Sequence, residues 1–199
     1  MSFFQKNKEI LIAAGFIAGG TVLYFGAKAI FGRDYLEKLK EQLSLTVGIS
    51  EIGADAGFSD AEFQKALKEL GWSAGMAWCV FYSKYIWSKI LPKKKWEVAK
   101  DLLTGNSQTT WANFNNKDKS GYFEISKKPK IGGIAIWQYP NATWKGHAGV
   151  VMKVVDSKTF IAQEGNYGGG VSANIPRKLV FDKVVEGEGF KLLGFINIK

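Results

Sequence analysis

The stretch that decides the fold runs from residue 132 to residue 155 and reads GGIAIWQYPNATWKGHAGVVMKVV. It holds two apolar runs, rich in isoleucine and valine, on either side of a polar turn, which is the pattern of two antiparallel strands. Three further runs of this kind follow it, namely TFIAQEG (159–165), KLVFDKVV (178–185) and KLLGFINI (191–198). The second half of the chain is therefore predicted to form an antiparallel sheet of about five strands.

Helices are predicted ahead of this sheet. Asp60 is suited to cap a helix through AEFQKALKELG, for which Gly71 is the stop signal. A second helix should begin near Trp78 and end at Leu91, because Pro92 cannot continue it. Helices followed by a sheet predict an α+β fold.

The N-terminal part has a different character. From Ile10 to Ala27 no residue is charged, and Ile30 and Phe31 extend the apolar stretch past Lys28. About 20 apolar residues in a helix span a bilayer, so residues 10–31 are predicted to form a transmembrane helix after a short segment, 1–9. A cleaved signal peptide is the competing interpretation, since Ala27-Lys28-Ala29 resembles a cleavage site.

The remaining chain divides into a juxtamembrane helix or stalk, residues 32–45, and a domain, residues 46–199. Residues 34–45, DYLEKLKEQLSL, place apolar positions at helical spacing. Basic residues lie on both sides of the apolar segment, so the positive-inside rule does not place the domain outside a cell. That conflict with an extracellular substrate would ease if the membrane belonged to a virus particle.

Composition limits the chemistry. The net charge of +9 favours an anionic surface as partner, but the lysine runs at 93–95 and 127–130 lie in no nucleic-acid-binding motif, so nucleic acid is not predicted as a partner. Cys79 is the single cysteine and His147 the single histidine. Disulfides and the common zinc sites are therefore not expected, and neither a metal nor another cofactor is predicted.

Three residues together supply what covalent amide hydrolysis needs. Cys79 lies where a helix should begin, and a helix N-terminus stabilises a thiolate. His147 opens one β-run and Glu164 lies near the end of the next, so neighbouring strands can bring the carboxylate to the imidazole. These are a nucleophile, a base and a group that orients the base.

These residues lie in segments that resemble a known family. The runs GWSAGMAWCVFYSKYIW, GNSQTTWANF, GGIAIWQYPNATWKGHAGVVMKVV, TFIAQEGNYGGGV and LLGFINI are similar to a CHAP domain, the papain-like amidohydrolase and endopeptidase module of cell-wall lysins. The resemblance covers residues 46–199. It implies that Cys79 attacks the scissile carbonyl, that His147 transfers the proton, that Glu164 orients His147, and that Asn166 supports the site.

The resemblance is incomplete. Many members of the family carry Gly-Asp where this chain has Gly132-Gly133, and no run of aspartates resembling a calcium loop is present. Tyr139 and Trp144 flank the turn before His147 and are candidates for substrate binding.

Three functional hypotheses follow. The first is a membrane-anchored peptidoglycan hydrolase, an N-acetylmuramoyl-L-alanine amidase or a peptide endopeptidase, that opens the cell wall locally as part of a phage virion or a bacterial envelope. Its partners would be peptidoglycan, the lipid bilayer through residues 10–31, and other virion or envelope proteins. The second is a catalytically retired CHAP fold that acts as an assembly module, and the third an intracellular membrane-tethered thiol hydrolase or acyltransferase.

Overall fold

A six-stranded antiparallel sheet forms the centre of the computed structural model, which describes residues 21–181 and 183–199 and the side chains from residue 34 onward. The strand order is β3-β8-β4-β5-β6-β7. The strands span Phe123–Ser126 (β3), Ile134–Tyr139 (β4), Ala142–Val154 (β5), Thr159–Tyr167 (β6), Gly170–Lys178 (β7) and Lys191–Ile198 (β8). Two short strands, Glu51–Ile52 (β1) and Gly57–Phe58 (β2), pair separately.

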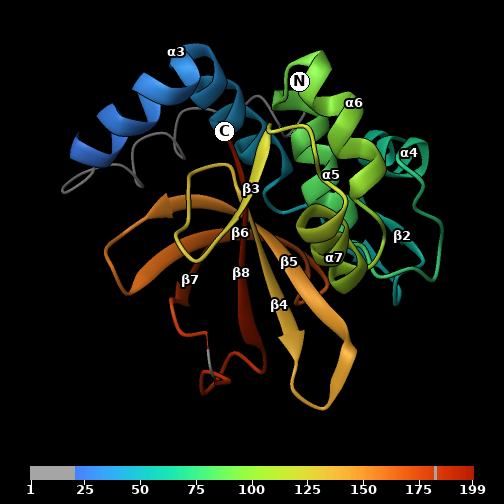
Figure 1. Ribbon diagram of the computed structural model, residues 1–199. Coiled ribbons are helices and arrows are strands. Elements are labelled where there is room, and N and C mark those ends of the chain that lie inside the picture. The colour runs from blue at the N-terminus through green and yellow to red at the C-terminus, as the bar shows by residue number, and fades with distance from the viewer. Residues whose placement is uncertain (1–20, 182) are drawn as a thin grey trace.

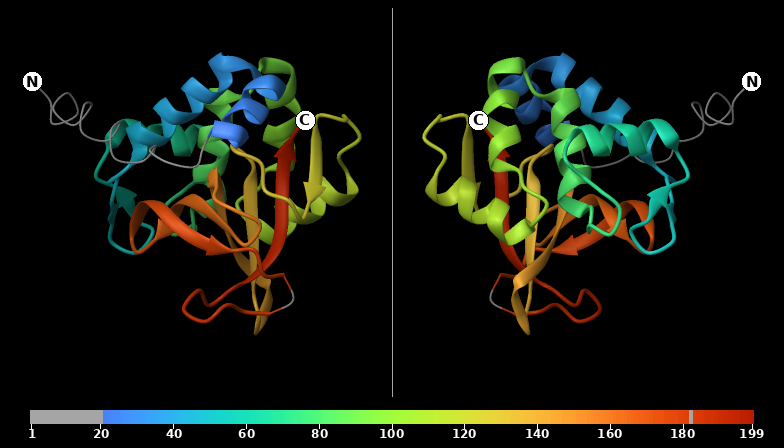
Figure 2. Two further views of the ribbon diagram at one scale, coloured as in Figure 1. Left: turned by 90° about the vertical axis from the view of Figure 1, so that its left-hand side faces the viewer. Right: turned by 90° about the vertical axis from the view of Figure 1, so that its right-hand side faces the viewer.

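Five helices lie on one side of this sheet within the described residues (Figures 1 and 2). They span Thr21–Thr46 (α3), Ala61–Glu69 (α4), Cys79–Ile90 (α5), Lys93–Leu102 (α6) and Ser107–Asn116 (α7). The predicted α+β fold, with helices packed on an antiparallel sheet, is confirmed.

The two predicted helices of the domain are present. Asp60 caps α4 by accepting a hydrogen bond from the amide of Phe63 at 2.8 Å, and Gly71 adopts a φ of 100° just beyond the helix end, which is the left-handed geometry that glycine tolerates. The helix α5 ends before Leu91-Pro92 as expected. The sequence did not indicate α6 and α7, which begin after Pro92 and after the capping residue Asn106.

One predicted strand is wrong. Residues 179–181 and 183–185 of the KLVFDKVV run form no strand, and β7 instead comes before them, at Gly170–Lys178. Gly168 and Gly169 have φ values of 65° and 77° and turn the chain directly from β6 into β7. Leu179 and Phe181 pack against the second core cluster, so apolar packing, rather than strand pairing, explains the apolar run.

The sheet has a core on each face. Between sheet and helices lies the larger cluster, in which Trp87 of α5 stacks on Phe123 of β3 at a centroid distance of 5.3 Å. The opposite face carries a smaller cluster that includes Trp137, Phe160 and Phe195. Successive side chains of a strand point to opposite faces of the sheet, so neighbouring residues of one strand pack in different clusters.

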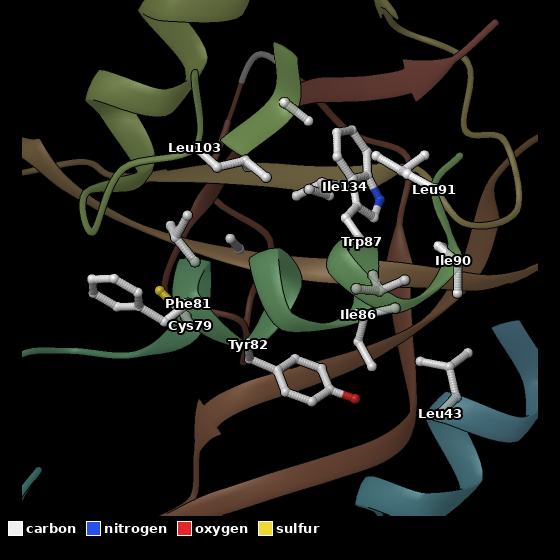
Figure 3. Close-up of a cluster of buried hydrophobic side chains, with 14 of the residues drawn as sticks. Leu43, Cys79, Phe81, Tyr82, Ile86, Trp87, Ile90, Leu91, Leu103 and Ile134 are labelled. Atoms are coloured by element: carbon white, nitrogen blue, oxygen red, sulfur yellow. The ribbon is translucent and has the colours of Figure 1, made fainter. Parts of the chain in front are cut away.

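The C-terminal part of α3 is built into the larger core. Tyr35, Leu36, Leu39 and Leu43 are buried, and Figure 3 shows Leu43 beside the side chains of α5. Gln163 of β6 fixes this contact, because its amide nitrogen donates to the carbonyl of Leu43 at 2.8 Å and is close to two hydroxyls, those of Thr46 and Tyr82.

Most of the predicted membrane segment cannot be assessed in this structure. Residues 10–20 lie outside the described residues, and residues 21–31 form the beginning of α3. Within the described part of the chain, no helix combines the length and the apolar character needed to cross a membrane.

Candidate active site

Cys79 is the first residue of α5, as Figure 3 shows. The preceding residue, Trp78, provides no side-chain cap for the helix. The first-turn amides and the positive end of the helix dipole are therefore available to a negative charge at the start of the helix. A thiolate at Cys79 is placed to receive that stabilisation.

The start of α5 is held in place from two sides. The indole nitrogen of Trp78 donates to Oε2 of Glu51 in β1 at 2.8 Å. On the other side, β6 approaches so closely at Gly165 that a Cβ there would lie 2.4 Å from Cβ of Tyr82. This glycine lets β6 contact the first turns of α5, and the two elements fix Cys79 relative to the sheet.

His147 of β5 and Glu164 of β6 meet where their two strands separate. The β5–β6 ladder ends at the Val150–Gln163 pair, and beyond it Glu164 crosses over Gly149. A Cβ on Gly149 would lie 2.6 Å from Cγ of Glu164. Because that space is free, Oε2 of Glu164 lies 2.8 Å from Nε2 of His147.

The electrostatics of His147 favour its protonated form. Burial by itself lowers the pKa of His147, but hydrogen bonding and negative charge at Cys79 and Glu164 outweigh burial and raise the pKa to about 9. Because Glu164 occupies Nε2, Nδ1 is the nitrogen left for the sulfur. An imidazolium is thus the favoured form of His147 near neutral pH, and a cysteine nucleophile requires a cation of this kind beside it.

Glu164 has a second partner that sequence reasoning missed. Arg177 of β7 donates from Nε to Oε1 at 2.8 Å and from a terminal nitrogen to Oε2 at 2.6 Å. Burial raises the pKa of Glu164, but the bonds from Arg177 and His147 outweigh that effect and lower it. One signal was present in the sequence, because Arg177 is one of only two arginines in a chain that otherwise uses lysine.

The structure places Asn166 next to a different carboxylate. Its side chain hydrogen-bonds to Asp55, and the amide of Asp55 donates to Glu51 at 3.1 Å. Since Glu51 also holds Trp78, Asn166 connects to the start of α5 through this loop rather than through His147.

Tyr139 and Trp144 are both exposed, at 41% and 66% of their surface. The β4–β5 register changes from Gln138–Gly146 to Tyr139–Ala142, so residues 143–145 bulge out of β5. The Tyr139 ring lies 5.0 Å from that of Phe190, which stacks on His147 at 5.3 Å. Tyr139 also lines a pocket of about 540 Å³ between this hairpin and Gly189.

The arrangement of a cysteine at a helix start, a histidine and a buried carboxylate can be compared with known families. Residues 71–166 match the CHAP domain. The matched segment contains Cys79, His147, Glu164 and Asn166, and the α+β architecture fits that fold. CHAP domains are typically cysteine- and histidine-dependent hydrolases of peptidoglycan. No curated protein matches the chain.

The departure at Gly132-Gly133 from the usual CHAP pattern has a local explanation. A Cβ on Gly133 would lie 2.5 Å from Oδ1 of Asn197. Asn197 is buried; it accepts from the amide of Lys130 at 3.1 Å and donates to the carbonyl of Lys128 at 2.9 Å. Asn197 of β8 thus holds the turn before β4. Among the described residues, no cluster of three or more histidine, cysteine or acidic residues could hold a metal ion.

Proposed function

We propose that this protein hydrolyses an amide bond of bacterial peptidoglycan, either between muramic acid and L-alanine or within the peptide, with Cys79 as nucleophile. The observation that carries the proposal is the 2.8 Å contact of Glu164 with Nε2 of His147, together with the hydrogen bond of Cys79 that helps to raise the pKa of the same imidazole. The CHAP match over residues 71–166 supports peptidoglycan as the substrate class.

The chemistry follows from the charge states. The Cys79 thiolate attacks the scissile carbonyl, and amides near the start of α5 are placed to stabilise the oxyanion. The His147 imidazolium gives its proton from Nδ1 to the leaving amine, which departs and leaves a thioester. Neutral His147 then takes a proton from water, the resulting hydroxide attacks the thioester, and Cys79 leaves as thiolate. Glu164 accepts from Nε2 throughout and keeps Nδ1 directed at the reaction.

The β4–β5 hairpin is proposed to bind substrate. Tyr139 and Trp144 present exposed rings on it, and Nζ of Lys145 lies 4.6 Å from the centre of the Trp144 ring. The side-chain nitrogen Nδ2 of Asn106 donates to the Trp144 carbonyl at 3.0 Å, so the bulge is attached to the start of α7. Exposed aromatic faces beside a pocket suit the apolar faces of sugar rings or a peptide stem.

The direct test uses the full-length protein on purified peptidoglycan from several bacteria, with mass spectrometry of the released fragments. We expect clearing by the wild type and none by Cys79→Ala or His147→Ala. Asn197→Ala, which alters a buried residue outside the site, serves as the control for lost stability, and its activity should follow the fraction of protein that stays folded. Fragments ending at a free L-alanine amine would identify an amidase. Failure of the wild type to cleave every wall type would refute the proposal.

We also propose that residues 10–31 anchor the protein in a membrane, and that this membrane belongs to a phage virion or a bacterial envelope. The support is the absence of charge between Ile10 and Ala27. We expect the full-length protein to stay associated with phospholipid vesicles after carbonate washing. We expect this association to be lost when residues 1–33 are removed. Recovery of both forms in the supernatant would contradict the anchor.

One observation favours the second candidate function, an assembly module built on a retired enzyme. Cys79 and His147 are only 6% and 5% exposed, so a substrate carbonyl has little direct access to the sulfur. A module of this kind predicts that Cys79 resists iodoacetamide in the folded protein, whereas the hydrolase predicts rapid alkylation. Because the chain has a single cysteine, intact-mass measurement reports on Cys79 alone.

A further inference from the structure

We infer that Arg177 is a positioning residue for the proposed hydrolysis. Arg177 holds Glu164 as a fixed anion, so that Glu164 keeps His147 in its working orientation after the imidazolium has lost its proton. The inference rests on the proposed function. Arg177 lies in β7, outside the segment 71–166 that matches the CHAP domain.

The two hydrogen bonds from Arg177 fix the orientation of the Glu164 carboxylate. Arg177 approaches Glu164 with two nitrogens, at 2.8 Å from Oε1 and 2.6 Å from Oε2, and Oε2 is also the atom that contacts His147. A two-point contact from a planar guanidinium fixes the plane of the carboxylate, which a single point charge cannot do. The orientation of Oε2 toward Nε2 is therefore set by Arg177.

The surroundings exclude water from this contact. Arg177 is 1% and Glu164 0% exposed. The guanidinium carbon lies 4.9 Å from the centre of the Tyr167 ring and 5.7 Å from that of Phe190, and Phe190 also stacks on His147. One aromatic side chain thus covers both the base and the arginine.

A second carboxylate completes the arrangement. Glu188 lies 3.7 Å from Arg177 and accepts a hydrogen bond from the amide of Lys178 at 3.2 Å. The ionisable groups facing one another here are Cys79 of α5, His147 of β5, Glu164 and Tyr167 of β6, Arg177 of β7 and Glu188 after β7. Glu188 and Phe190 hold this cluster from the segment between β7 and β8.

The need for a second cation arises at the thioester stage. Before reaction, the imidazolium and Arg177 both face Glu164. Once Cys79 is acylated and His147 has given its proton to the amine, Arg177 is the cation that remains. A buried carboxylate without a cation tends to take up a proton. Protonated Glu164 would donate a hydrogen bond to Nε2, and the proton of neutral His147 would then lie on Nδ1. In that state Nδ1 could not accept a proton from water.

The test compares Arg177→Met and Arg177→Lys with the wild type in the full-length protein, with Asn197→Ala as a control for lost stability. The first readout is the iodoacetamide alkylation rate of Cys79 against pH. We expect the pH of half-maximal rate to rise by about one unit in Arg177→Met, because Glu164, without its two bonds from Arg177, is no longer held against Nε2 and stabilises the imidazolium less. Arg177→Lys, which keeps the charge, should shift this value less. An unchanged or lower value in Arg177→Met overturns the inference.

The second readout is turnover of soluble muropeptides with intact-mass detection of the acylated enzyme. Arg177→Met should lower kcat by about 100-fold and lower KM with it, so that kcat/KM changes little, and it should accumulate thioester, since hydrolysis is the step affected. Arg177→Lys, which keeps the charge and is the more conservative replacement, should recover part of kcat. A loss of activity that merely follows the folded fraction, as in Asn197→Ala, overturns the inference.

The two readouts separate the two proposals. If wild-type protein cleaves no peptidoglycan but the alkylation profile shifts in Arg177→Met, the proposed function fails while the role of Arg177 at His147 stands. If the wild type cleaves peptidoglycan and both Arg177 variants keep its kcat and alkylation profile, the hydrolase stands and the role of Arg177 fails.

Discussion

His147 couples the candidate active site to stability. Its pKa in the folded protein is about 9, compared with 6.5 as its ordinary value, so the folded state favours the protonated form. The stabilisation is complete below about pH 6.5 and is lost as the pH rises through about 9. We expect the free energy of unfolding to fall over this range by on the order of 3 kcal/mol, as measured by urea denaturation.

Cys79→Ala provides the comparison for this pH dependence, because Cys79 is one of the two groups that raise the pKa of His147. The slope of stability against pH should be smaller in that variant. A wild-type unfolding free energy that stays constant from pH 6.5 to 9 would show that His147 is not protonated in the folded protein.

Gly149 controls access of Glu164 to His147. In Gly149→Ala the new Cβ would lie 2.6 Å from Cγ of Glu164, so the carboxylate must move. Because displacing a catalytic group by about 1 Å can cost 100-fold in rate, we expect a loss of that size in turnover of muropeptides. Gly121→Ala, at a glycine with φ of 74° and open space around it, controls for backbone strain and should keep its activity.

At the scale of elements, the sequence predicted those parts whose signals are local. A capping aspartate, a stop glycine and a proline define α4 and α5, and continuous apolar runs define β4, β6 and β8. The helix α7 was missed because its residues, SQTTWANFNN, have a weak apolar pattern, and it depends on Asn106 accepting from two amides. A helix that depends on a polar cap of this kind gives a weak signal in the sequence, although the cap is evident in the structure.

The candidate site also has a part that the sequence predicted and a part that it did not. Cys79, His147 and Glu164 could be selected because their chemistry and strand order suggest one another. Arg177 could not be placed with them, since the pairing of β7 with β6 depends on a turn at Gly168-Gly169, and the sequence was interpreted as placing the strand at 178–185 instead. The pairing of β7 with β6, rather than residue type, shows that Arg177 belongs with these three residues.

The contact between α3 and the sheet depends on Gln163. Replacing it by leucine, which has a similar size, removes the bond to the Leu43 carbonyl and the contacts with the hydroxyls of Thr46 and Tyr82, and leaves Thr46 as the donor to that carbonyl. We expect Gln163→Leu to lower the free energy of unfolding by about 2 kcal/mol, measured by urea denaturation, with kcat within about twofold of wild type at low temperature. A change below about 0.5 kcal/mol would indicate that water or another donor replaces the amide.

At the scale of the whole molecule, the folded unit is larger than the segment that matches the CHAP domain. Four buried apolar residues of α3, at positions 35, 36, 39 and 43, lie before residue 71, and β7 and β8 lie after residue 166. Burial of one such side chain contributes about 1.5–3 kcal/mol. Four of them are comparable to the 5–15 kcal/mol by which whole domains are usually stable.

A truncation series tests this directly. A chain that begins at residue 34 retains all four side chains and should unfold cooperatively, whereas a chain that begins at residue 47 exposes the surface they covered and should not fold. Circular dichroism and thermal denaturation provide the measurement. A cooperative transition in the shorter chain would mean that α3 is an appendage rather than part of the core.

Gln163 and Glu164 are adjacent on β6, and their side chains point to opposite faces of the sheet, one to α3 and the other to His147. Any mechanical load applied along α3, as by a bilayer pulled away from a rigid wall, would therefore be delivered to the strand one residue from the group that orients the base. The proposed catalytic geometry and the proposed N-terminal attachment share a single strand, so tension on the chain would alter turnover at Cys79.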